Sequence, residues 1–179
     1  MLFNGGHKIV KDKDLLSIDY LPTEIVGREE EIKDLAFNFS YLFRENPSLP
    51  ELLIYGNVGT GKTVCMNYIL RHLKAEAKQR NTLLKVINIK CSEARTKYEI
   101  LKKILTELLN TEISLSSSSD MHGKIVENLA ERGGFLLLFL DEIHEIKETD
   151  INSVLFTISR LGEDISYSIP NKQGKLNSD

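Results

Sequence analysis

The stretch LLIYGNVGTGKT, residues 52–63, passes from apolar side chains to glycines and ends on a lysine and a hydroxyl. Its second part, residues 56–63, fits the pattern G-x-x-x-x-G-K-[ST]. The apolar residues predict a strand, and the spacing of apolar residues after the glycines predicts a helix. Glycines allow successive backbone N–H groups to face one point, and the start of the helix adds the positive end of its dipole. The stretch therefore predicts a phosphate-binding loop between a strand and a helix.

Two side chains of this loop have expected roles of their own. Lys62 would supply a full positive charge to the β- and γ-phosphates of a nucleotide, and Thr63 would hold Mg²⁺ through its hydroxyl. The nucleotide-binding residues that the loop predicts are Gly56, Asn57, Val58, Gly59, Thr60, Gly61, Lys62, Thr63 and Val64.

A second apolar run, FLLLFLDE at residues 135–142, ends on two acidic residues. Its continuous apolar character predicts a strand that is buried on both faces, and parallel sheets bind ligands at the carboxyl ends of their strands. Asp141 is expected to hold the water shell of Mg²⁺. Glu142 is expected to polarise the attacking water, because hydrolysis of a γ-phosphate requires an oriented nucleophile.

Short apolar runs alternate with longer amphipathic ones along the rest of the chain. This alternation predicts an α/β fold in which a parallel sheet carries helices on both faces, a three-layer sandwich. The serine run before residue 121 indicates a loop whose Asp120 or neighbouring serine caps the next helix, and Gly133-Gly134 ends that helix. Strands are expected at residues 52–55, 83–91 and 135–140, and helices at residues 28–43, 65–77, 98–109, 121–131 and 151–162.

The composition describes one ordinary globular domain. Of the 179 residues, 41% are hydrophobic and 27% are charged, which excludes disordered and fibrous classes. No apolar run reaches the roughly 18 residues of a membrane helix, and the N-terminus lacks the pattern of a secretion signal, so we expect a cytoplasmic protein without a membrane partner. Cys65 and Cys91 have no metal-type spacing and are expected to be buried thiols. The formal charge of −3 gives no global positive field for nucleic acid.

The residues upstream of the loop indicate a more specific class of protein. The stretch LLSIDYLPTEIVGREEEIKDL, residues 15–35, together with GNVGTGKT, CSEARTKYEILKKIL, LDEIHEI and VLFTISRLGED, resembles the AAA+ replication initiators of the origin-recognition and cell-division-control type, especially archaeal ones. The resemblance spans about residues 11–164 and implies ATP as the nucleotide. By the same resemblance, the adenine pocket would be lined by Leu21, Pro22, Ile25 and Val26. A turn followed by a helix cap explains Pro22 and Gly27 equally well.

The resemblance also implies further parts that follow the matched region. The family continues into a fourth strand with a sensor asparagine, an arginine finger, a lid and a winged helix that binds DNA. We therefore expect residues 1–164 to be the N-terminal part of an AAA+ ATPase domain, with a fold that is incomplete at the C-terminus. Residues 165–179 would be a short tail in which ISYSI, residues 165–169, is a candidate for a degraded fourth strand, and Asn171 is a candidate for the sensor.

Two classes of function remain open from the sequence. The first is an initiator-type ATPase that binds ATP and Mg²⁺ and hydrolyses ATP very slowly; the second is a nucleotide-dependent adaptor or regulator without turnover. A helicase fits less well, because no later helicase motif is present. By resemblance, the partners would be an AAA+ neighbour or a replicative helicase, and double-stranded origin DNA bound weakly through residues 95–103. That segment carries Arg95, Lys97, Lys102 and Lys103, and a solvated helix face is the simpler interpretation.

Overall fold

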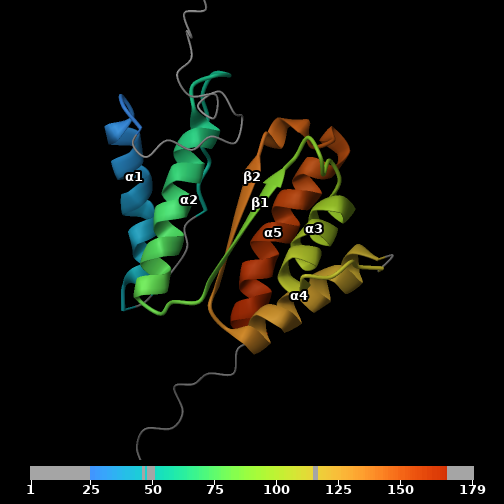
Figure 1. Cartoon of the computed structure of the whole chain (residues 1–179). Helices are drawn as coiled ribbons and strands as arrows, with labels where there is room; N and C mark the ends of the chain where they lie inside the picture. The colour runs from blue at the N-terminus through green and yellow to red at the C-terminus, as the bar shows by residue number, and fades with distance from the viewer. Residues whose placement is uncertain (1–24, 46, 48–50, 115–116, 169–179) are drawn as a thin grey trace, which may run out of the picture. The chain divides into compact units, whose positions relative to one another are not determined.

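The computed structural model describes residues 25–45, 47, 51–114 and 117–168. The chain divides into two compact units, Met1–His72 and Leu73–Asp179. Helix α2, Lys62–Gln79 (Figure 1), has its first residues in the first unit and its last residues in the second. None of the described helices is long and apolar enough to cross a membrane.

The first unit contains α1, Glu29–Phe39, the 3₁₀ turn η2, Ser40–Phe43, and the first part of α2. The helix expected at residues 28–43 is therefore confirmed, with its last turn tightened to 3₁₀. Three glutamates in the first turn of α1 lie where the helix dipole favours negative charge. Four apolar residues of α2 in this unit recur at helical spacing and are buried: Cys65, Met66, Ile69 and Leu70.

The strand predicted at residues 52–55 is wrong. Residues 51–57 have no regular secondary structure, and the side chains of Leu53 and Tyr55 are 78% and 87% exposed. A strand is stable only when a neighbouring strand pairs with its backbone N–H and C=O groups, and an apolar sequence does not supply that neighbour. In the described residues, the sheet has two strands, and both belong to the second unit.

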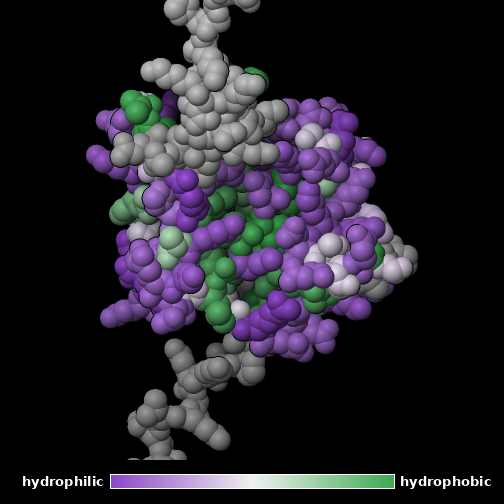
Figure 2. All heavy atoms as spheres, viewed as in Figure 1, coloured by the Kyte–Doolittle hydropathy of each residue, from purple (hydrophilic) through white to green (hydrophobic). Residues whose placement is uncertain are grey.

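The second unit is built on the parallel pair β1, Leu84–Lys90, and β2, Phe135–Asp141. Their register runs from Leu84 opposite Phe135 to Lys90 opposite Asp141. Both predicted strands are confirmed, and the parallel sheet of the α/β class with them. No residue of β2 is exposed, although only Leu137 is fully buried. Figure 2 shows hydrophobic residues gathered over the two strands.

Three helices cover one side of this sheet (Figure 1). They are α3, Lys97–Leu109, α4, Ser118–Arg132, and α5, Glu148–Ser168. Parallel strands need a crossover connection, and α3 and α4 form it. The shared core consists chiefly of Ile87, Ile89, Ile100, Leu101, Ile104, Leu105, Leu108, Met121, Ile125, Leu129, Val154 and Leu161. Helices on a second face of the sheet, the third layer of the predicted sandwich, remain a prediction.

The ends of α4 confirm the helix start and the helix end that the serine run and the double glycine predict. The hydroxyl of Ser117 caps α4 by accepting a hydrogen bond from the N–H of Ser119 at 3.2 Å, so a serine and not Asp120 is the cap. Gly133 follows α4 with a left-handed φ of 68°, as the double glycine predicts.

The prediction of a fourth strand at residues 165–169 is also wrong over residues 165–168, the part of this segment that the structure describes. Helix α5 continues to Ser168, and Ile165 packs against the core of the unit. The apolar residues that recur at helical spacing from residue 151 continue to Ile165. Helical hydrogen bonds join residues four positions apart, so this segment can be helical without a neighbouring strand. Asn171 lies outside the described residues.

Candidate functional site

The glycine-rich loop of the first unit joins a segment without regular secondary structure to helix α2. Gly59 and Gly61 have φ values of 79° and 81°, in the left-handed region that disfavours side chains. Among the described residues, no atom lies within 4 Å of a Cβ placed at either position, so the backbone angle is what requires glycine here. The N-terminus of α2, which starts at Lys62, adds the positive end of its dipole at this place.

The side chain of Lys62 folds over this loop. Its Nζ atom donates hydrogen bonds to the carbonyl oxygens of Gly56 at 2.9 Å and Asn57 at 2.8 Å. The hydroxyl of Thr60 also donates to the carbonyl of Asn57, at 2.9 Å. These contacts bring four of the predicted residues into one exposed turn with an ammonium group above it, which suits a phosphate chemically.

The other predicted residues of the loop differ in accessibility. Thr63 is half-buried in the first turn of α2, and Val64 beside it is exposed. Val58 at the tip of the loop is 98% exposed. Of the predicted adenine pocket, Ile25 is half-buried and Val26 is 87% exposed, whereas Leu21 and Pro22 lie outside the described residues. The structure thus leaves the adenine pocket as a prediction.

The predicted acidic pair lies at the carboxyl end of β2 in the second unit. Asp141 is the last residue of the strand, and its carbonyl accepts a hydrogen bond from the N–H of Cys91 at 2.9 Å. Glu142 has a left-handed backbone, with φ of 55° and ψ of 46°, and its N–H donates to Oδ1 of Asp141 at 3.0 Å. Such a conformation costs a non-glycine residue about 1–3 kcal/mol and is typical of functional sites.

Cys91 lies beside this pair and is fully buried. Burial, together with the negative charges of Asp141 and Glu142, raises the pKa of its thiol to about 11. The thiol is therefore protonated and unreactive at neutral pH. Cys65 is buried as well, and neither cysteine forms a disulfide, which confirms the prediction of two buried thiols.

The chemistry of the donors fits ATP and Mg²⁺. Mg²⁺ binds hard oxygen ligands, usually one or two from the protein and the rest from water and phosphates, and the hydroxyl of Thr63 and the carboxylate of Asp141 are of this kind. Among the described residues, no group of three or more His, Cys, Asp or Glu side chains forms a metal site. Thr63 and Asp141 belong to different units, and the structure sets no distance between them.

The sequence did not predict that Arg95 and Glu145 lie together near the acidic pair. The guanidinium of Arg95 contacts Glu145, fifty positions further along the chain: Nε donates to the carbonyl oxygen at 2.9 Å, and Nη2 lies 3.2 Å from Oε2. No periodicity or motif relates two residues so far apart. The one local signal was the capping box that begins at Thr96, directly after Arg95.

The proposed DNA-contacting segment, residues 95–103, is partly neutralised by carboxylates. Arg95 is paired with Glu145, and Nζ of Lys103 lies 3.0 Å from Oε2 of Glu93. The hydroxyl of Thr96 and the backbone N–H groups of Arg95 and Thr96 hold the pKa of Glu99 below its usual value. Only part of the positive charge counted from the sequence is therefore available to a phosphate backbone.

Fold and loop together define a class: an α/β protein with a parallel sheet and a glycine-rich, lysine-containing loop at a helix N-terminus. Residues 24–169 match the family model described as AAA ATPase domain. Because this match covers most of the chain, the chain belongs to the AAA ATPase domain family.

The similar proteins narrow the comparison within this family. The ORC1-type DNA replication protein of Thermococcus kodakarensis is 30% identical over 167 residues, which cover 90% of this chain and 40% of that protein. The protein of the same name from Pyrococcus furiosus is 28% identical, over 89% of this chain and 39% of the relative. This chain thus spans about two fifths of the length of these relatives.

Solved structures agree with the sequence comparison. The structure of the Aeropyrum pernix ORC1 protein in complex with DNA matches with a TM-score of 0.74 at 28% identity, over 84% of this chain and 40% of that one. Cdc6p from Pyrobaculum aerophilum matches with a TM-score of 0.73 at 23% identity, over 87% of this chain and 40% of that one, and supports the fold alone.

Proposed function

We propose that this chain is an ATP-binding module of a DNA replication initiator. The observation that carries the proposal is the loop at the start of α2, where the ammonium of Lys62 lies over the carbonyls of Gly56 and Asn57. The matching relatives are named ORC1-type DNA replication proteins, which supports a role in replication initiation. In this role Lys62 contacts the β- and γ-phosphates, and the loop N–H groups cradle them.

Hydrolysis in this proposal uses the acidic pair. Bound Mg²⁺ would supply positive charge to the phosphates. Asp141 would hold the water shell of the ion together with the hydroxyl of Thr63, and Glu142 would orient and polarise the attacking water. An AAA+ neighbour or a replicative helicase is the proposed protein partner, and the cytoplasm is the proposed compartment, because replication proteins act where the chromosome lies.

The test of nucleotide binding is the melting temperature. Millimolar Mg·ATP is expected to raise it, because a ligand that binds only the native state stabilises that state by mass action. GTP at the same concentration is expected to give a clearly smaller shift, if Ile25 and Val26 belong to an adenine pocket. A melting temperature that ATP does not change would contradict the proposal, and equal shifts with both nucleotides would contradict the adenine assignment.

We propose that contact of this chain with duplex DNA is weak. Two of the four cations in residues 95–103 are paired with carboxylates, which leaves chiefly Lys97 and Lys102. Neutralising two phosphates gives a slope of about −2 in a plot of log affinity against log salt concentration.

Fluorescence anisotropy on a labelled duplex should therefore show affinity no tighter than micromolar at physiological salt. The slope should decrease more for Lys97→Ala or Lys102→Ala than for the paired Lys103→Ala. Sub-micromolar binding at that salt would overturn this proposal.

A further inference from the structure

The turn that follows Asp141 holds an unfavourable backbone conformation at Glu142. Within the turn, the N–H of Glu145 donates to the carbonyl of Glu142 at 2.8 Å, and the N–H of Ile146 donates to the carbonyl of Ile143 at 3.2 Å. Ile146 is buried and anchors the far end of the turn. A left-handed non-glycine residue persists only where its surroundings fix it, so contacts from outside the turn decide how firmly Glu142 is held.

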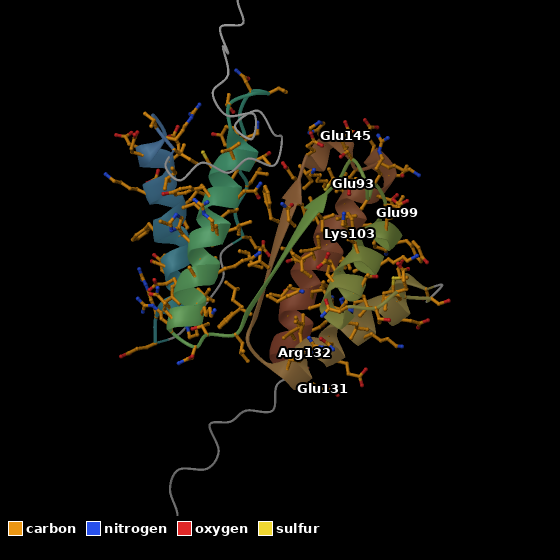
Figure 3. The ribbon with its side chains drawn as sticks, viewed as in Figure 1. Glu93, Glu99, Lys103, Glu131, Arg132 and Glu145 are labelled. Atoms are coloured by element: carbon orange, nitrogen blue, oxygen red, sulfur yellow. The ribbon has the colours of Figure 1, made fainter. Side chains whose placement is uncertain are left out.

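Arg95 makes those outside contacts. Its Nε atom donates to the carbonyl of Glu145 at 2.9 Å, its Nη2 atom lies 3.2 Å from Oε2 of the same residue, and its own carbonyl accepts the N–H of Lys147 at 3.0 Å. Both ends of the segment from Glu145 to Lys147 are thus joined to one residue of the loop after β1. Figure 3 shows Glu145 at the same end of the second unit as Glu93 and Glu99.

Arg95 is itself fixed by the capping box of α3. Its N–H donates to Oε2 of Glu99 at 2.8 Å, and the same carboxylate oxygen accepts hydrogen bonds from the N–H and hydroxyl of Thr96 at 3.0 and 2.9 Å. The start of a well-packed helix therefore supports the backbone from which Arg95 reaches the turn. The chain of contacts runs from α3 through Arg95 to the residues that follow β2.

We propose that Arg95 is a positioning residue that holds the turn at residues 142–146, and through it Glu142, in the orientation needed for ATP hydrolysis. The proposal rests on the proposed function for the role of Glu142. In this proposal the guanidinium of Arg95 supports the active site and does not contact DNA. The hydrogen bond to the carbonyl of Glu145 is the main contact, because an ion pair between side chains as exposed as these is weak in water.

The proposal predicts a separation of turnover from binding. Arg95→Ala is expected to lower ATP turnover about three- to tenfold, less than the roughly hundredfold cost of a full 1 Å misplacement. ATP affinity should stay within about twofold, because Arg95 lies far along the sequence from the loop of Lys62 and acts only on the turn. Arg95→Lys should restore part of the rate, since one Nζ atom can reach the carbonyl without the second arm of the guanidinium.

Arg132→Ala is the matched control. Nη1 of Arg132 also donates to a backbone carbonyl of another element, that of Leu108 at 3.1 Å, but at the opposite end of the unit (Figure 3). The experiment uses the full chain and measures three quantities for each variant: release of radiolabelled phosphate at saturating ATP, affinity for a fluorescent ATP analogue, and amide hydrogen exchange of the peptide that covers residues 142–147.

Each outcome decides one question. Slower turnover, unchanged affinity and exchange that is about fivefold faster in residues 142–147 for Arg95→Ala alone would support the proposal. Wild-type turnover and exchange in Arg95→Ala, or equal losses in Arg132→Ala, would overturn it. If the wild type bound no ATP, the proposed function would fail, and the exchange rates would still show whether Arg95 holds the turn.

Discussion

Replacement of Lys62 by alanine is expected to abolish the stabilisation that Mg·ATP gives the wild-type chain. At a hundredfold excess over the dissociation constant, a ligand adds about 2.7 kcal/mol to the free energy of unfolding. For a protein of this size that corresponds to a rise of roughly 5–10 °C in melting temperature. Lys62 supplies the full positive charge of the loop, and a charge-assisted hydrogen bond to a phosphate is among the strongest that a side chain makes.

The nucleotide-free stability of Lys62→Ala should change little. The two hydrogen bonds of its Nζ atom are made on an exposed surface, where their net contribution is small. Lys78→Ala is the matched control, because Lys78 is an exposed lysine in the last turn of the same helix. Differential scanning fluorimetry with and without Mg·ATP measures all three proteins. A shift in Lys62→Ala that equals the wild-type shift would contradict the assignment of this loop as the phosphate site.

The second large effect is expected for Glu142→Gln, which should lower ATP turnover by about a hundredfold or more while affinity for ATP remains close to that of the wild type. General-base assistance contributes about 10²–10⁴ in rate, and glutamine keeps the shape of the side chain without its basic carboxylate. Asp141→Asn should instead weaken binding in the presence of Mg²⁺, because Asp141 is proposed to act on the metal and not on the water. Phosphate release and nucleotide affinity, measured on the same preparations, separate the two roles.

A carboxylate outside the site provides the control for this series. Glu148 lies exposed in the first turn of α5, and Glu148→Gln is expected to leave both quantities unchanged. The wild-type rate itself is expected to be below about one turnover per second, under the usual enzyme range. If the wild type binds ATP and Glu142→Gln has the same rate as the wild type, Glu142 is not the base. If the wild type binds ATP but releases no phosphate above background, the regulator without turnover is the better description.

Most regular elements of the second unit could be predicted from the sequence. The helices α3 and α4 lie within three residues of the expected ranges, and α5 begins three residues before its expected range, because helical hydrogen bonds and side-chain contacts join residues three or four positions apart. The two strands were found because β-branched and continuous apolar runs are typical of buried parallel strands. The phosphate-binding loop was recognised because its glycines, lysine and threonine are contiguous.

Only the tertiary structure decided the features that depend on partners distant in sequence. Residues 52–55 have the composition of a strand but no neighbour that pairs with them in the described sheet, and residues 165–168 continue a helix. The contact of Arg95 with Glu145 depends on the register of β1 against β2, which brings the loops after the two strands together. Local patterns report interactions within one turn or one strand, whereas strand pairing and loop contacts join residues about fifty positions apart, and their free energy depends on how the whole unit packs.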